Sequence, residues 1–157
     1  MAPRSKSVAA WLALVLGTVG AHRIYLHGPR DWLGWLHALP TMLGLLGVLR
    51  MQQQGQDDRL AWLLIPLLGL MLSQAMLCAI VFGLTSDERW NAHHNPTQPG
   101  NDGHWSAVLA AGTALLVGGA VLMGTIAFGG QKFFEWQIEG ERAAAVQQAP
   151  GSGPAKP

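Results

Sequence analysis

Four long runs without a charged residue divide this chain of 157 residues, and they constrain its fold more than any other feature. The runs cover residues 7–21, 32–49, 60–86 and 105–131 and contain 15, 18, 27 and 27 residues. An α-helix needs about 20 apolar residues to cross about 30 Å of hydrocarbon, so the last two runs suffice and the second nearly does. The first reaches that length only if its helix continues to Leu26, because each residue adds about 1.5 Å.

The composition also favours a lipid environment. Half of the residues are apolar and only 12% are charged, which is too few to cover the surface of a soluble domain of this size. The formal net charge is +1 and the chain has no block of Lys or Arg, which argues against nucleic acid as a partner. We therefore expect an all-α integral membrane protein that has the lipid bilayer as its surroundings.

We predict four transmembrane helices, arranged as two antiparallel hairpins over residues 1–50 and 51–131. The turn signal at Gly28 and the following proline separates the two helices of the first hairpin. The predicted spans cover residues about 7–26, 32–50, 60–84 and 106–130, with an outer loop over 85–105. Residues 132–157 are predicted to form an amphipathic helix at the membrane interface, followed by a disordered tail.

The distribution of Lys and Arg predicts the side that the termini face. With four spans, both termini lie on one side together with seven of the ten Lys and Arg residues. Cytoplasmic segments are enriched in Lys and Arg, so we expect both termini in the cytoplasm. The alternative is a cleavable signal peptide, because Arg4 and Lys6 precede an apolar run that ends in small residues at Ala21. Only ten residues separate this run from the next one, which favours a hairpin over cleavage.

Polar groups within the predicted spans are functional candidates, because they are costly in hydrocarbon. For His37, a neutral imidazole that is hydrogen-bonded to a neighbouring helix is favoured over a proton relay or a cofactor ligand. His22 and His27 are expected near the membrane surface rather than opposite His37, which argues against a pair of haem ligands. Gln74 is expected to make interhelical hydrogen bonds, with a polar pathway as the alternative.

A second histidine-rich segment, "NAHHNPTQPGNDGHW", occupies residues 91–105. It offers imidazole and carboxylate ligands for a transition metal at His93, His94, Asp102 and His104. Adjacent histidines are not a standard pair for one tetrahedral ion, and the Pro, Gly and Asn content is typical of a solvated loop. A plain polar loop is therefore preferred over a metal site, and we expect no cofactor.

The segment "GTVGAHRIYLHG" over residues 17–28 ends the first apolar run in polar side chains. Gly17 and Gly20 are expected to let the second helix approach closely. Arg23 and Tyr25 are expected to anchor the outer end of the first helix, since an arginine near a helix end can extend its charge to the headgroups. Asp31 is predicted to cap the second helix and to pair with Arg23 across the turn.

This segment and its surroundings, from Lys6 to about Arg50, resemble the TM-two domain, a family of two-helix membrane hairpins with many small bacterial members. The family's motif usually reads Gly-x-x-Gly-x-His-Arg-Phe-Tyr-Leu-Gly. The matching residues here are Gly17, Gly20, His22, Arg23, Tyr25, Leu26 and Gly28, with Lys6 before the first helix. The resemblance implies a multi-pass protein of the bacterial inner membrane, and it supplies no reaction.

The chain departs from the family's pattern at three places. Ile24 replaces the usual Phe, and His27 is inserted before the closing glycine. The acidic residue often found late in the family's second helix is missing, and Arg50 lies in that vicinity. Any function that depends on that acid is therefore in doubt for this chain.

Three classes of function fit these observations. The sequence shows no phosphate-binding loop, nucleophile elbow, paired catalytic carboxylates or His-Glu-x-x-His pattern, so we expect no enzymatic activity. The leading hypothesis is a membrane protein that acts through helix association with itself, as a homo-oligomer, or with another membrane protein. The alternatives are a small transporter or proton-conducting bundle that uses His37 and Gln74, and a metal- or haem-binding accessory protein.

Overall fold

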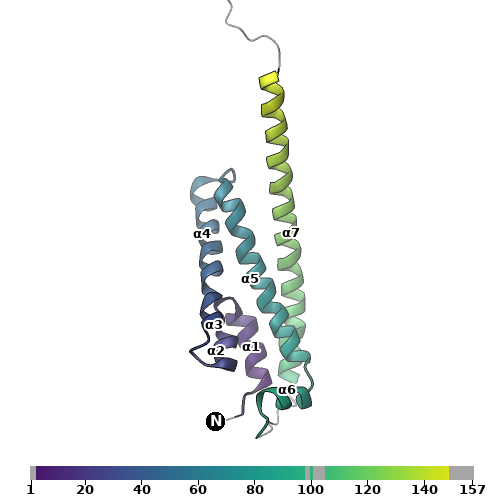
Figure 1. Cartoon of the computed structure of the whole chain (residues 1–157). Helices are drawn as coiled ribbons and strands as arrows, with labels where there is room; N and C mark the ends of the chain where they lie inside the picture. Colours follow the sequence, from purple (N-terminus) through teal and green to yellow (C-terminus); the bar gives the residue numbers. More distant parts are fainter. Residues whose placement is uncertain (1–2, 98–99, 101–104, 149–157) are drawn as a thin grey trace, which may run out of the picture.

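The computed structural model describes residues 3–97, 100 and 105–148, and all elements in this part of the chain are helical. They are α1 (Lys6–Leu16), the 3-10 helix η1 (Gly17–Val19), α2 (Ala21–His27), α3 (Trp32–Leu36), α4 (Ala38–Gln54), α5 (Arg59–Leu84), α6 (Asp87–His94) and α7 (Trp105–Gln148). Figure 1 shows α5 between the long helices α4 and α7, with the shorter helices gathered at one end of the bundle. The expected all-α fold is confirmed for the described residues.

Three stretches of the described chain are long and apolar enough to cross a membrane, namely Trp32–Gln54, Arg59–Leu84 and Trp105–Gln148. The first joins α3 and α4, which meet at His37. These stretches contain the predicted spans over 32–50, 60–84 and 106–130. The apolar runs of the sequence therefore located the three candidate membrane-spanning stretches.

The predicted span over residues 7–26 does not form as one crossing helix. The helix α1 ends at Leu16, and Gly20 takes a left-handed φ of 79° before α2 begins. The chain reverses there. A hydrogen bond from the backbone N–H of Ser5 to the Tyr25 hydroxyl at 2.9 Å shows the reversal. This bond places the start of α1 beside the end of α2. With 11 residues, α1 is about 16 Å long, which is roughly half of the hydrocarbon thickness.

The first two helices therefore form a short hairpin, α1–η1–α2, that enters the bundle from one end. The apolar run before His22 is too short to cross a bilayer, and the reversal returns Arg23 toward the end at which the run begins. Irregular backbone is tolerated at membrane depth only where protein covers it. Gly17 and Gly20 in the turn are both buried, so the structure meets this requirement.

The described chain begins and ends at opposite ends of the bundle (Figure 1). The backbone N–H of Arg4 donates to Oδ1 of Asn95 at 2.7 Å, next to α6. At the other end, beside the turn over residues 55–58, Nη2 of Arg59 lies 3.2 Å from Oε2 of Glu139. The expectation that both termini share one side of the membrane depends on four crossing helices. The reversal at Gly20 leaves three candidate crossing helices.

The reversal also changes the balance of basic residues between the two ends. The α6 end carries Arg4, Lys6, Arg23, Arg30 and Arg89, and the opposite end carries Arg50, Arg59, Lys132 and Arg142. Among the described residues the division is thus five against four. The distribution of Lys and Arg therefore no longer favours either orientation in the membrane.

Small residues occupy the contacts between the long helices. A Cβ added to Gly44 of α4 would lie 2.5 Å from Cβ of Leu68, and one added to Gly47 would lie 2.6 Å from Cβ of Leu64. On the other side of the bundle, Ala13, Ala79 and Ala114 are fully buried where α1, α5 and α7 meet. Lipid gives no hydrophobic reward for helix association, so this close backbone approach is what packs the bundle.

The last helix differs from the prediction of an interfacial segment after residue 131. α7 is one continuous helix of 44 residues, about 66 Å long, and it projects past the α4–α5 turn (Figure 1). Gly140 does not interrupt it, since one glycine costs a helix only about 1 kcal/mol. The ion pair of Lys132 and Glu135 at 2.6 Å supports the first projecting turn. The predicted disordered tail, over 151–157, lies outside the described residues.

Candidate functional site

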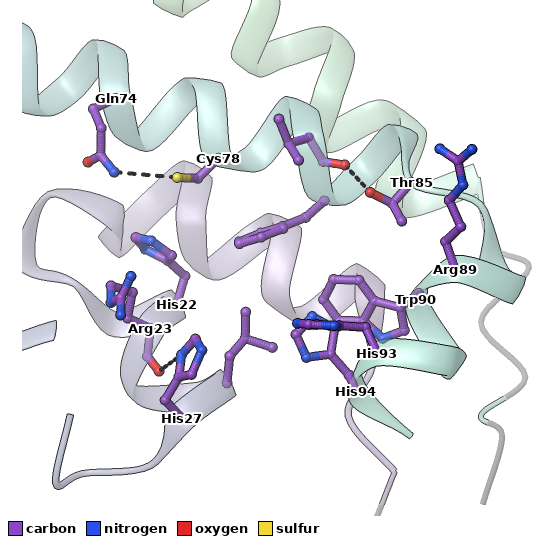
Figure 2. A pocket seen from close by; sticks show the side chains of 13 residues that line it. His22, Arg23, His27, Gln74, Cys78, Thr85, Arg89, Trp90, His93 and His94 are labelled. Carbon is purple, nitrogen blue, oxygen red and sulfur yellow. Dashed lines mark hydrogen bonds between the residues drawn. The ribbon is translucent and has the colours of Figure 1, made fainter. Parts of the chain in front are cut away.

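A groove of about 440 Å³ lies at the α6 end of the bundle, between α2, α5 and α6. Figure 2 shows its polar side chains, which are His22, Arg23, His27, Gln74, Thr85, Arg89, His93 and His94. Leu26, Val81, Phe82 and Trp90 supply apolar walls. Within the described part of the chain, no Asp or Glu lines it. The groove therefore combines a basic, histidine-rich lining with apolar surface.

The α2 side of the groove is held by an ion pair that the sequence predicted. Nε of Arg23 donates to Oδ2 of Asp31 at 2.9 Å, and Oδ1 of Asp31 accepts from the backbone N–H of Leu33 at 3.2 Å. The second contact caps the N-terminus of α3, so the predicted cap and the predicted pair are both confirmed. The Arg23 hydrogen bond lowers the pKa of the Asp31 carboxyl, and this side chain therefore favours its charged form.

His22 occupies a position that sequence reasoning placed wrongly. We expected it near the membrane surface and not opposite His37. It is only 2% exposed, and among the described residues its Nδ1 has no hydrogen-bond partner. Its ring lies 5.7 Å from the ring of His37 and 5.9 Å from that of Phe82. The error came from treating residues 7–26 as one straight helix, whereas the reversal folds α2 against α5.

His37 bonds within its own helical turn rather than to a neighbouring helix. Its Nδ1 lies 2.6 Å from the carbonyl oxygen of Leu33. The bond between helices is made instead by Thr41, whose hydroxyl donates to the carbonyl of Thr18 in η1 at 2.7 Å. The rings of His22 and His37 meet edge to face at 81°. No sequence pattern points to Thr41, because a single threonine in an apolar helix is common.

Gln74 lies at one end of the groove (Figure 2). Its side chain is exposed, and its amide Nε2 lies 3.5 Å from Sγ of Cys78, one turn further along α5. The interhelical hydrogen bond expected for Gln74 is therefore not the one that forms. Thr85 lies at the other end, 11 residues after Gln74, so the groove extends about 16 Å along α5.

The α6 side of the groove is an eight-residue helix within what was expected to be a loop. Trp90 is 2% exposed, and its Nε1 donates to the carbonyl of Arg4 at 2.8 Å. Its ring stacks 5.8 Å from that of Phe82 and 4.3 Å from that of His94. These contacts reach from α6 to the N-terminal segment and to α5, and no pattern within residues 85–105 signals them.

The structure places His93 and His94 together, with ring centroids 4.7 Å apart. Burial lowers the pKa of His94, and the neighbouring His93, Arg4 and His27 lower it further, so the neutral form is favoured. Asp102 and His104, the other proposed ligands, lie outside the described residues. In the part of the chain that the structure does describe, no group of three His, Cys, Asp or Glu residues is arranged to hold a metal ion.

The glycines of the opening motif each meet a specific steric demand. A Cβ on Gly17 would lie 2.6 Å from Cβ of Ala75, and one on Gly20 would lie 2.0 Å from the carbonyl oxygen of Gly34. Gly20 and Gly28 also have left-handed φ values, 79° and 92°. The motif thus shapes a tight hairpin that packs against both α3 and α5.

The fold defines a helical membrane protein in which a short N-terminal hairpin packs into a bundle of three helical stretches that are long and apolar enough to cross a membrane. Residues 2–51 match the model of a known family, which is described as the TM2 domain. The matched segment covers α1 to most of α4, which confirms the resemblance of this part of the chain to the TM-two family. No curated protein and no solved structure matched the chain.

Proposed function

We propose that this chain is a non-enzymatic, multi-pass protein of the bacterial cell membrane that acts by lateral association of its helices. The partner is a second copy of the chain or another membrane protein, and α7 supplies the contact. Two features support this proposal, the half-covered bundle and an open face of α7.

The short hairpin covers only half of the bundle. α1 packs against α5 and α7 up to the level of Gly17 and Ala75. Beyond that level, α5 contacts α4 at Leu68 on one side and α7 at Thr125 on the other. Among the described residues, no fourth helix packs against this part of α4, α5 and α7 (Figure 1). A partner helix can therefore reach the three crossing helices directly.

The strongest support for helix association is the outward face of α7. Gly112, Leu116, Gly119 and Met123 follow helical spacing on one side of α7, and all four are exposed. A Cβ added to Gly112 or to Gly119 would meet nothing within 4 Å. A glycine within a helix costs about 1 kcal/mol relative to alanine, and small residues let membrane helices approach closely. This face is therefore suited to another helix.

The groove supports a second candidate, a small transporter or proton-conducting bundle. A polar lining that enters the bundle beside His22 and reaches Gln74 has the composition of an ion pathway. Flux of protons into sealed vesicles that contain the purified chain, driven by a pH gradient, would support this candidate. Vesicles with the protein that remain as tight as empty vesicles would exclude proton conduction.

Disulfide crosslinking in native membranes tests the association. In a Cys78→Ser chain, Gly119→Cys places one thiol on the open face of α7. Leu39→Cys is the matched control, because Leu39 lies in a crossing helix, is 58% exposed and belongs to α4. We expect a mild oxidant to trap a dimer, or an adduct with a partner, at Gly119→Cys and not at Leu39→Cys.

Two results would contradict the proposal. Equal crosslinking at both positions would mean random collision in the bilayer, and no crosslinking at either would mean that α7 faces lipid alone. The Gly112→Cys variant repeats the measurement two turns away on the same face. Failure at both glycine positions, in chains that accumulate normally in the membrane, would end the proposal.

A further inference from the structure

The groove at the α6 end lies where the bundle changes from apolar to charged surface. Val81 and Phe82 belong to the crossing helix α5, whereas Asp87, Glu88 and Arg89 begin α6. Lipid headgroups occupy the layer next to the hydrocarbon, so a groove at this boundary faces them. We propose that it binds the phosphate headgroup of an anionic lipid. This inference is independent of helix association.

The lining supplies one arginine and one hydrogen-bonding imidazole from each of two helices. Arg23 and His27 come from α2, while Arg89 and His93 come from α6. Two of the acidic residues nearby are engaged elsewhere, since Asp31 pairs with Arg23 and Asp87 pairs with Lys6. The third, Glu88, is exposed and is not among the residues that line the groove. A phosphate group with several acceptor oxygens complements such a lining, and arginine in particular can donate two parallel hydrogen bonds to it.

Arg89 is the group best placed to take a new anion. Its side chain is exposed, and in the described part of the chain its guanidinium forms no ion pair. Figure 2 shows it at the rim of the groove, on the α6 side. Arg23, by contrast, already donates to Asp31 and can share only its remaining donors.

The apolar walls favour a lipid over a free phosphate ion. Val81 is 54% exposed next to the half-buried Phe82, and these two side chains give the groove an open apolar surface. A free ion would gain nothing from this surface, whereas a lipid would bury its glycerol and upper acyl chains against it. The volume of about 440 Å³ lies within the range of small-molecule sites, roughly 300 to 1,000 Å³. Basic pockets between membrane helices are known to take lipid headgroups.

The walls are fixed before any ligand arrives. The hydrogen bond from Trp90 to the carbonyl of Arg4 holds α6, and the pair of Arg23 and Asp31 holds the turn after α2. A preformed site avoids the entropic cost of ordering its side chains on binding. We therefore expect the lipid to remain bound when detergent removes the surrounding bilayer.

Native mass spectrometry of the full chain in mild detergent tests this inference. Dioleoyl phosphatidylglycerol and dioleoyl phosphatidylcholine have the same acyl chains, and only the first carries a net negative charge. We expect the first lipid adduct to be at least about tenfold tighter for phosphatidylglycerol, and we expect Arg89→Gln to remove most of that preference. His93→Gln should weaken it independently. Arg59→Gln is the control, since Arg59 is a similarly exposed arginine at the opposite end.

Three outcomes would overturn the inference. Equal binding of the two lipids by the unaltered chain would show that the groove does not select charge. An Arg59→Gln chain that loses as much preference as Arg89→Gln would place the lipid elsewhere. Full displacement of phosphatidylglycerol by millimolar inorganic phosphate would identify a free-anion site. Circular dichroism of each variant checks that the helices are intact, and His93→Gln decides the matter if Arg89→Gln is unfolded.

Discussion

The indole Nε1 of Trp90 donates a hydrogen bond to the backbone carbonyl of Arg4 over 2.8 Å, across 86 positions of the chain. Nδ2 of Asn95 donates to the same carbonyl at 3.0 Å. Both bonds tie the N-terminal segment to α6. They are possible because α1 and α2 form a hairpin, so that the first helix does not carry the chain across the membrane.

This arrangement predicts the sidedness of three segments. In a Cys78→Ser chain, we expect Pro3→Cys and Glu88→Cys to react with a membrane-impermeant maleimide from the same side. Gln56→Cys, in the turn after α4, should react only from the other side, because α5 crosses the bilayer between Gln56 and Glu88. Labelling of intact and of inverted membrane vesicles measures both accessibilities.

The four-span alternative makes the opposite prediction for one position. It places Pro3 with Gln56 rather than with Glu88. Joint labelling of Pro3→Cys and Gln56→Cys from one side would therefore show that the hairpin does not form in the membrane.

Gly20 is the residue on which the reversal depends. We expect Gly20→Ala to lower the free energy of unfolding by about 2 to 5 kcal/mol, since a left-handed φ costs a non-glycine residue about 1 to 2 kcal/mol and overpacking adds about 1 to 3. The added Cβ would lie 2.0 Å from the carbonyl oxygen of Gly34, so the hairpin must move away from α3. Thermal unfolding in detergent, followed by circular dichroism, measures the loss.

Gly140→Ala is the matched control for this substitution. Gly140 lies in the projecting part of α7, away from Gly112 and Gly119, and an added Cβ meets nothing within 4 Å. Alanine should there raise helix stability by up to about 1 kcal/mol. Equal effects of the two substitutions would mean that the left-handed turn at Gly20 is not required.

The three crossing helices could be predicted from the sequence because hydrocarbon thickness sets a length that each must reach. The Asp31 cap and its ion pair with Arg23 could be predicted as well, since both depend on residues only two and eight positions away. The reversal at Gly20 could not be predicted in this way. A run of 15 uncharged residues is compatible both with a short span and with a hairpin, and contacts with Gly34 and Ala75 decide between them.

The groove could not be predicted from the sequence for the same reason. Its walls come from α2, α5 and α6, and the cluster of Leu26 with Trp90 forms only when the hairpin brings α2 to the end of α5. The sequence predicts a helix after residue 131, but its charged residues favour a separate interfacial segment over one that continues α7. The helix continues because its exposed turns retain good helix formers such as Glu, Arg, Ala and Gln.

Asp31 predicts a pH dependence of stability. Its hydrogen bond from Arg23 lowers its pKa in the folded chain below the usual 3.8, so the pair stabilises the fold above that pH. The contribution disappears as the pH falls through the lowered pKa. At pH 7 we expect Asp31→Asn, which can still cap α3, to melt at a lower temperature than the unaltered chain.

The difference between the two chains should shrink below about pH 4, where the Asp31 carboxyl of the unfolded chain becomes protonated, and it should vanish below the lowered pKa of the folded chain. Asp58 has a similarly lowered pKa through its bond from Arg50, but it is present in both chains and cancels in the comparison. Melting temperatures measured from pH 7 to pH 3 give the difference directly. A difference that stays constant over this range would show that the ion pair does not contribute.

The last prediction concerns His22, which is buried although one of its ring nitrogens has no hydrogen-bond partner among the described residues. A buried polar atom without a partner costs about 1 to 3 kcal/mol, and Nδ1 of His22 has none among the described residues. We therefore expect His22→Leu, which is of similar size, to raise the free energy of unfolding by about 1 kcal/mol. His27→Leu is the control, since the His27 side chain is 51% exposed and its replacement should change stability by less than about 0.5 kcal/mol. A His22→Leu chain that is less stable than the unaltered one would show that the imidazole is satisfied within the membrane.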